Sequence, residues 1–474
     1  MRATPFTSDH PNLAYREPGD PYRTPPPARR VYNREFEPFR RFLLGGILPP
    51  HELDARYATQ VENPPANSLE LRYGDQMWEG DELADHVVEM FYREGPAKSR
   101  RLLEQALDEG ISSMTDPPGE LVRLFAQLDR IPDWIDEGTI ENGNIIACRG
   151  GLFSHTLFFL IDLILTHYTG MARPLAATGK INAEYRLLET ATFFSKVSLP
   201  GSMVRYSEGF KRAVLVRIMH ALVRRRQLDP GHRSQEAYDH AGMIISNHDM
   251  GGMCWAYSLQ IMLAYRQFGG EFTDDELHSA FRYWCYICYV MGVNEETIPK
   301  SFEENCRYMN YHWASAEAPV VGTGFLREQI LRQFSVAGQG SKKLSILGRY
   351  VLSPMMRRMF GDAACDNLGI PDSRLKHVIR PMLYVAIRSQ LAAKKLMFHL
   401  RLTRRLGDKF WDHYNAKVTA KLVQVDEAVA RAEHGRSLGS YSHHDTADGD
   451  GKASAKELRS GIAMIYREVT GHFA

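Results

Sequence analysis

The chain has 474 residues, of which 44% are hydrophobic and 24% are charged. This composition is typical of a globular protein and excludes a collagen-like, coiled-coil or fully disordered chain. Because 58 lysines and arginines nearly balance 57 aspartates and glutamates, the formal net charge is only +1. We therefore expect no nucleic-acid partner and no anionic membrane surface held by bulk charge.

Targeting signals and cysteine usage both favour a cytoplasmic protein. The six cysteines show no regular spacing, which is typical of a reducing compartment. No apolar stretch of signal-peptide length follows Arg29-Arg30, so no cleaved signal is expected. The longest apolar run, residues 151–165, is shorter than the about 20 residues that span a bilayer. It predicts a buried central helix and no transmembrane segment.

The chain divides into an arm, a helical body and a tail. Half of the 24 prolines lie in the first 65 residues, so residues 1–75 are predicted to be an extended, proline-rich arm. Beyond it, apolar residues recur at three- and four-residue spacing, and strand patterns are nearly absent. The sequence predicts helices around 85–111, 118–129, 145–168, 184–198, 208–227, 252–267, 274–291, 324–334, 343–360, 373–406 and 409–433. We therefore expect an all-α domain over residues 76–434.

Residues 435–474 are predicted to form a polar tail with a degenerate EF-hand-like loop and a terminal helix. The loop, residues 446–457, has acidic residues or glycine at EF-hand positions 3, 5, 6 and 12, namely Asp448, Asp450, Gly451 and Glu457. Position 1 is Thr446, and no convincing helix enters the loop. A flexible acidic linker is favoured over a tight calcium site.

Several common catalytic motifs are missing from the sequence. It has no P-loop and no G-x-G-x-x-G between a strand and a helix, so a nucleotide site is not supported. It has no Glu-x-x-His pair, which a di-iron carboxylate bundle requires. Cys285 and Cys288 form a C-x-x-C inside an aromatic helical pattern, where thiols that fill the core are favoured over a metal or redox site.

The most informative segment is residues 186–224. Arg217 and Arg224 flank His220 at i−3 and i+4, so all three lie on one helical face. A haem would explain this crowding, since it offers iron to a neutral imidazole and two propionates to the guanidiniums. The spacing also fits a solvated basic face with an incidental histidine. In the preceding predicted helix, Arg186 and Thr190 share a face beside Glu189, as a polar ceiling over a cofactor would.

These segments resemble the family of the mycophenolic acid biosynthesis oxygenase MpaB and the bacterial rubber oxygenases known as latex clearing proteins. The resemblance covers roughly residues 76 to 400. It is carried by GDELADHVVEMFYREGPAKSRRLLEQALDEGI (80–111), IPDWID (131–136), LAATGKI (175–181), RLLET (186–190), VRIMHALVR (216–224), SNHDMGGMCWAYSLQIMLAYRQFGGEFTDDE (246–276) and YVMGVNEETIP (289–299). Several ordered segments at family-like spacing are more specific than any one motif.

The resemblance implies an all-helical, globin-like bundle around a b-type haem, with His220 as proximal ligand and the metal ligand of the site. It also implies that Arg217 and Arg224 surround this ligand and that Arg186 and Thr190 lie above the haem. Two departures concern the rubber-cleaving members. Their distal lysine is replaced by Glu189, and their glutamate base falls near Thr169-Gly170, where it is not matched. Both departures argue against polyisoprene cleavage.

We therefore expect a haem-b-dependent oxygenase or oxidoreductase that acts on dioxygen and a small apolar substrate. Both saturated and unsaturated substrates are compatible with the sequence. Arg186, Glu189 and Thr190 are the expected catalytic residues, and His220, Arg217 and Arg224 are expected to bind the cofactor. A non-catalytic haem protein that senses gas or redox state, and a helical interaction scaffold, are the alternatives. A homo-oligomer is compatible with the sequence. Asn247 and Asp249 either line the same cavity or cap the next helix.

Overall fold

The fold is described from a computed structural model, in which residues 15–17, 19–142, 157, 160, 161, 164, 189, 190, 192–228, 235–317, 348–401 and 417 are placed. In these residues the chain is helical and forms no strand beyond one isolated bridge between Gly45 and Leu48. The predicted all-α fold class is confirmed. No helix in these ranges combines the length and the apolarity needed to cross a membrane.

The helices follow one another along the chain with short connections. The first group is α1 (Glu37–Leu44), α2 (Ala58–Glu62), α3 (Leu69–Asp75), α4 (Glu82–Glu94), α5 (Pro96–Glu109), α6 (Gly119–Leu128) and α7 (Glu137–Asn142). The second group is α12 (Glu208–Gln227), α13 (Gln235–Ala241), α14 (Asn247–Gly251), the π-helical turn Trp255–Leu259, α15 (Gln260–Gln267), α16 (Asp274–Val290) and α17 (Phe302–Ala314). The third is α20 (Ser353–Phe360), α21 (Asp362–Asn367) and α22 (Ile379–Arg401).

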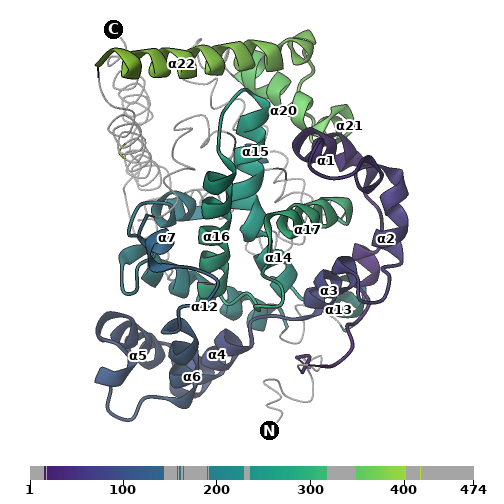
Figure 1. Ribbon diagram of the computed structural model, residues 1–474. Coiled ribbons are helices and arrows are strands. Elements are labelled where there is room, and N and C mark those ends of the chain that lie inside the picture. Colours follow the sequence, from purple (N-terminus) through teal and green to yellow (C-terminus); the bar gives the residue numbers. More distant parts are fainter. Residues whose placement is uncertain are drawn as a thin grey trace, which may run out of the picture.

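The core lies where α15, α16 and α17 meet the π-helical turn, in the middle of the molecule (Figure 1). Three fully buried tryptophans come from these elements: Trp255, Trp284 and Trp313. Helix α12 packs along α4 at one end of this core, and α22 lies across the opposite end (Figure 1). The α4–α12 pair therefore forms a distinct layer, and it carries the face with His220.

Local sequence explains where α4 begins and ends. The Asp81 side chain accepts a hydrogen bond from the amide of Ala84 at 3.2 Å, which caps the first turn. Gly95 ends the helix with φ of 85°, in the left-handed region that a side chain disfavours. Pro96 then occupies the first turn of α5, where its missing amide proton is tolerated.

The predicted extended arm is wrong for residues 27–75. This region contains α1 to α3 and several 3₁₀ turns, and Phe36 and Phe39 of its first part are fully buried. The prolines mislead because Pro27, Pro38 and Pro50 lie in the first turns of helices, where proline is favoured rather than disruptive. Among the described residues before Pro27, the chain does lack regular helix.

Other predictions have mixed outcomes. Helices predicted at 118–129, 208–227 and 274–291 are present, whereas α17 was not predicted. Leu157, Leu160, Ile161 and Ile164 of the predicted central helix are helical and buried. Cys285 and Cys288 are buried, free thiols, as expected for core packing. The tail from residue 435, its loop at 446–457, and the domain boundary at 434 lie outside the described residues, so those expectations stay predictions.

Phe39→Ala should destabilise the protein by about 3–5 kcal/mol, the usual cost of truncating a buried phenylalanine. Phe39 packs against Trp313 and Phe360, with ring centroids 5.0 Å and 4.1 Å away, so the cavity would open between α1, α17 and α20. Urea unfolding of the two proteins measures this difference. Val31→Ala is the control, because Val31 is 61% exposed and should change stability by less than about 0.5 kcal/mol. Equal effects of the two substitutions would contradict the placement of α1 in the core.

Candidate functional site

A cavity of about 230 Å³, counted to its open side, lies between α4, α12 and α14. Among the described residues it is lined by Gly80, Asp81, Arg217, His220, Arg224, Ile245, Asn247, Met250, Met291 and Gly292. His220 and its two flanking arginines, singled out from the sequence, therefore do face one common space. Much of this volume is open to solvent, and the space enclosed between the side chains is about that of one water molecule.

Three of the basic residues of helix α12 line the cavity, and they differ in how deeply they are buried. Arg217 and Arg224 are 2% and 1% exposed, whereas His220 is half-buried with its Nδ1 atom inside the protein. The solvated basic face considered from the spacing is therefore wrong for the two arginines. Their burial requires partners for both guanidiniums.

Those partners are two aspartates at the start of α4. The Arg217 Nε and Nη2 atoms donate to the two carboxylate oxygens of Asp81 at 2.6 and 2.9 Å. The Arg224 Nε atom donates to Asp85 at 3.0 Å, and its Nη2 atom donates to the same carboxylate at 2.5 Å. Both pairs have the two-pronged geometry that makes arginine–carboxylate contacts strong. They join α12 to α4 on either side of His220.

Two glycines permit this close packing. A Cβ atom on Gly80 would lie 2.4 Å from Arg224 Nε, and one on Gly292 would lie 1.9 Å from Asp81 Oδ2. Neither position can carry a side chain without displacing an ion pair. Gly292 also has φ of 84°, which an L-residue with a side chain rarely adopts.

Ile245 contributes a strained backbone to the cavity wall. Its φ is 53°, which is a true outlier for a β-branched residue. Its carbonyl accepts a hydrogen bond from Arg224 Nη1 at 3.1 Å, and this contact helps to hold the strained conformation. Strain of this kind persists only where surrounding contacts fix it, and it is concentrated at functional sites.

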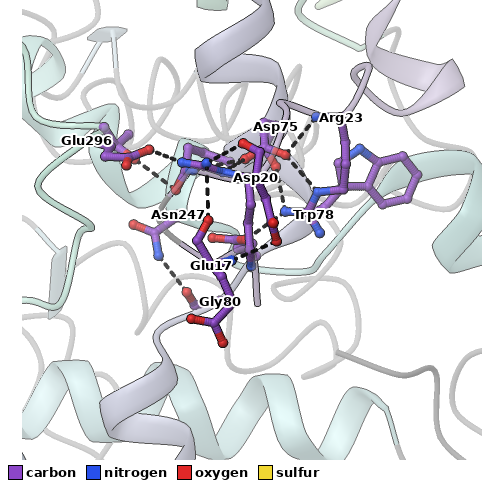
Figure 2. Close-up of polar contacts among 12 residues, drawn as sticks. Glu17, Asp20, Arg23, Asp75, Trp78, Gly80, Asn247 and Glu296 are labelled. Carbon is purple, nitrogen blue, oxygen red and sulfur yellow. Dashed lines mark hydrogen bonds and ion pairs between the residues drawn. The ribbon is translucent and has the colours of Figure 1, made fainter. Parts of the chain in front are cut away.

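Asn247 closes the rim beside Ile245. Its amide nitrogen Nδ2 donates to the carbonyl of Gly80, a contact drawn in Figure 2, and its Oδ1 atom accepts from the amide of Asn294 at 2.6 Å. Of the two sequence alternatives, Asn247 lines the cavity. Asp249 does not, and it is not the cap either, because Ser246 caps α14.

The N-terminal segment binds to the outside of the same layer. The Tyr15 hydroxyl donates to Asp85, so this carboxylate serves both Arg224 and the N-terminal segment. Arg23 donates to the buried Asp75 at 2.7 Å, and Figure 2 shows these two residues next to Trp78. Tyr15 and Arg23 therefore belong to the structure that supports the cavity.

Burial dominates the protonation behaviour of these groups. It raises the pKa of the Asp85 carboxyl from its ordinary value, although the positive charge of Arg224 opposes the rise. Burial, followed by the nearby charge of Asp85, also raises the pKa of the Tyr15 hydroxyl well above 10.0. Tyr15 is therefore a neutral donor at physiological pH. Asp85 depends on Arg224 to stay ionised.

The residues predicted above the haem are described only in part. Glu189 is buried and Thr190 is half-buried, and both are helical. Neither lines the cavity bounded by the described residues. Arg186, together with Thr169 and Gly170, lies outside the described residues. The structure therefore brings together His220, Arg217 and Arg224, and the roles of Arg186, Glu189 and Thr190 stay predictions.

Sequence analysis missed Asp81 and Asp85. Both occur in the segment GDELADH, at i and i+4 of the same helical face, directly after Gly80. This spacing is a detectable signal for two carboxylates that act together. Their partners lie 136 and 139 residues further along the chain, so the sequence could not pair them.

Asp85→Asn should destabilise the protein by about 3–5 kcal/mol, because it leaves the buried guanidinium of Arg224 without its counter-charge. Urea unfolding at neutral pH measures the loss. The matched control is Asp108→Asn, which removes the partner of Lys211 on the same helix α12. Asp108 is 61% exposed, so this loss should be no more than about 1 kcal/mol. A similar loss in both variants would show that the Asp85–Arg224 pair has no special role.

Comparisons with known proteins agree with the fold and extend to activity. Residues 152–389, half of the chain, match the family described as the catalytic domain of the ER-bound oxygenases mpaB/B' and the rubber oxygenases. The fold is similar to that of a solved structure described as "Structure of Latex Clearing Protein LCP in the closed state". The sequences are 18% identical, the TM-score is 0.55, and the similarity covers 74% of this chain and 91% of the other.

No protein with curated function matches the chain. The likeness to the solved structure, at its low identity, concerns the fold alone, whereas the family match concerns the sequence of the catalytic domain itself. The resemblance inferred from the sequence is confirmed. The chain belongs to the mpaB and rubber oxygenase catalytic-domain family, and it is an oxygenase, an enzyme of the oxidoreductase class.

Proposed function

We propose that this oxygenase uses a b-type haem whose proximal ligand is His220. The observation that carries the proposal is the position of His220. It is a half-buried imidazole that faces the cavity from a helix fixed on both sides by buried ion pairs. An axial ligand requires an imidazole that faces the cofactor's side of the helix and a rigid support.

The described residues fit a haem edge in their chemistry. Part of the cavity lining is apolar and suits a macrocycle: it comes from Ile245, Met250 and Met291. Two further positions, Gly80 and Gly292, carry no side chain that would reduce the space. When bound, a haem would supply dioxygen activation, which no protein side chain provides by itself. The protein contributes the ligand, the walls and the charges around them.

The two arginines differ in how many N–H donors they have left for a haem propionate. An arginine has five N–H donors, and the described contacts of Arg224 use three: one at Nε, one at Nη2 and one at Nη1. Two donors remain for a propionate without loss of Asp85. Arg217 uses four, because its Nη1 atom also bonds Gln127 and the carbonyl of Val290, and it keeps one. Arg224 is therefore the better propionate partner.

Glu189 and Thr190 are proposed to handle protons on the opposite side of the haem. A threonine hydroxyl can donate a hydrogen bond, and a buried carboxyl can hold or release a proton at its oxygen. Arg186, four residues before Thr190 in the sequence, would add a positive charge there. These three roles rest on the resemblance of RLLET to the family motif.

The substrate is proposed to be small and apolar, and different from polyisoprene. Its apolar character rests on the resemblance to the family. In rubber-cleaving members the resemblance implies a lysine where this chain has Glu189 and a glutamate near Thr169-Gly170. A carboxylate in place of an amine reverses the charge of the pocket and changes what it can bind. The cytoplasmic location stays a prediction.

His220→Ala should abolish stoichiometric haem binding and leave the helical fold intact, because the iron bond is lost while the apolar faces of α12 remain. The Soret band and the haem-to-protein ratio of the purified protein measure cofactor content, and circular dichroism measures helicity. His278→Ala is the control, since His278 is exposed on α16.

Full haem content and an unchanged spectrum in His220→Ala would refute the ligand assignment. A wild-type protein that binds haem and dioxygen but oxidises nothing would support the sensor alternative instead. A wild-type protein without a Soret band after reconstitution with haem would refute the cofactor proposal altogether.

Incubation of the haem-loaded protein with latex should release no isoprenoid aldehydes or ketones. The reason is the Glu189 carboxylate, which replaces the cationic side chain of the rubber-cleaving members. Glu189→Gln should lower turnover of an accepted substrate and spare haem content, because it removes an ionisable proton carrier of the same size. Chromatography of carbonyl products tests the first expectation. Detection of these products from the wild-type protein would contradict the substrate proposal.

A further inference from the structure

Three possible metal ligands meet between α14 and α17, apart from the His220 cavity. His248 and Asp249 come from α14, and His312 comes from α17. The two histidines are 0% and 2% exposed, and the Asp249 side chain is 7% exposed. One ligand atom from each residue lies within 4.8 Å of the others. Two imidazoles and a carboxylate are a donor set that first-row transition metals accept.

The two imidazole rings are arranged for a shared ion. His312 Nδ1 and His248 Nε2 are 3.0 Å apart, and the ring planes differ by only 8°. With the metal–nitrogen bonds of about 2.0–2.1 Å that zinc forms, this separation corresponds to an angle of about 90–95° at the metal. That angle suits adjacent ligands on one face of a metal, as in two-histidine, one-carboxylate sites. Asp249 would complete the face after a small shift of its side chain.

A single N–H···N hydrogen bond also accounts for the 3.0 Å separation. Two neutral rings carry one N–H each, and only one N–H can lie between them. The other lies on His248 Nδ1 or His312 Nε2. His312 Nε2 lacks a hydrogen-bond partner among the described residues, whereas the His248 ring interacts with the backbone of Tyr73. Coordination would leave an N–H on the outer nitrogen of each ring. The free energy cost of a buried N–H without a partner is several times smaller than the binding free energy of structural metal sites.

The surroundings hold the carboxylate in place. Arg29 Nη1 donates to Asp249 Oδ1 at 3.1 Å, and the Ser246 hydroxyl donates to Oδ2 at 2.9 Å. Such outer contacts orient a ligating carboxylate and leave it further lone pairs. Glu317 lies 3.8 Å from the same guanidinium and offsets part of its positive charge.

The protonation states are those that ligation needs. Burial, followed by the charge of Arg29, lowers the pKa of His312 to about 3, so its ring is neutral near pH 7. Burial, the largest single influence, raises the pKa of Asp249, but the charges of Arg29 and His312 and the hydrogen bonds from Ser246 and Arg29 together lower it below its ordinary value, so the carboxylate is ionised. Neutral imidazoles and an ionised carboxylate bind a metal without first releasing a proton.

We propose that His248, Asp249 and His312 bind one divalent first-row transition metal, and zinc serves as the redox-inactive probe of the site. The metal would join α14 to α17. It would thereby fix the cavity wall, because Asn247 and Met250 of the same short helix line the His220 cavity. This proposal does not depend on the haem at His220.

The test is metal analysis of the full-length protein as purified, after incubation with zinc and removal of loose metal on a chelating resin. About one zinc per chain is expected in the wild type, and at least fivefold less in His312→Gln and in Asp249→Asn. His278→Gln is the matched control, since it removes an exposed histidine on α16 and should keep the zinc. Zinc-edge X-ray absorption of the wild type should show two imidazoles in the first shell.

Haem content, measured in the same samples by its absorbance, separates this proposal from that of the haem site. Zinc should raise the thermal midpoint of the wild type and of His278→Gln, but not that of His312→Gln. A wild type that retains no zinc would overturn the proposal, as would equal zinc in all variants, which indicates adventitious surface binding. If His312→Gln does not fold, Asp249→Asn and the absorption spectrum of the wild type decide the matter.

Discussion

The interaction on which the candidate site depends is the double attachment of α12 to α4 by Arg217–Asp81 and Arg224–Asp85. Each guanidinium is buried, so each needs its carboxylate in order to remain there. Buried pairs of this kind add little net stability compared with apolar packing, but they are costly to break, and they fix direction. Here they fix the rotation of α12 about its axis, so that His220 faces the cavity.

The same constraint extends into loops that are far away in the sequence. Arg224 also donates a hydrogen bond to the carbonyl of Ile245, whose positive φ is one that isoleucine rarely adopts. Asn247, two residues further on, donates a hydrogen bond to the carbonyl of Gly80. Arg29 links the N-terminal region to Asp249, on the other side of the same short helix. The cavity wall is therefore rigid because polar contacts on both sides of α14 are satisfied by residues from the first third of the chain.

How much of this the sequence could predict depends on the range of each interaction. Long helices such as α12 and α16 are predictable from the spacing of their residues, and so is the grouping of Arg217, His220 and Arg224 on one face. Helix α17 was missed because Asn305, Asn310 and His312 are fully buried inside it, so its apolar pattern is interrupted. The role of Asp81 and Asp85 was not predictable, since tertiary pairing alone reveals it. The prolines of residues 27–75 were misread because their effect depends on their position in a helix.

The central claim is that the imidazole of His220 is the protein ligand of a haem iron. Resonance Raman spectroscopy of the ferrous protein and of His220→Gly with added imidazole tests it most directly. The account predicts an iron–nitrogen stretching band in the wild type, its loss in His220→Gly, and its return with imidazole, at a frequency that shifts when the imidazole is isotopically labelled. A band that persists in His220→Gly without imidazole would contradict the account, because another residue would then hold the iron.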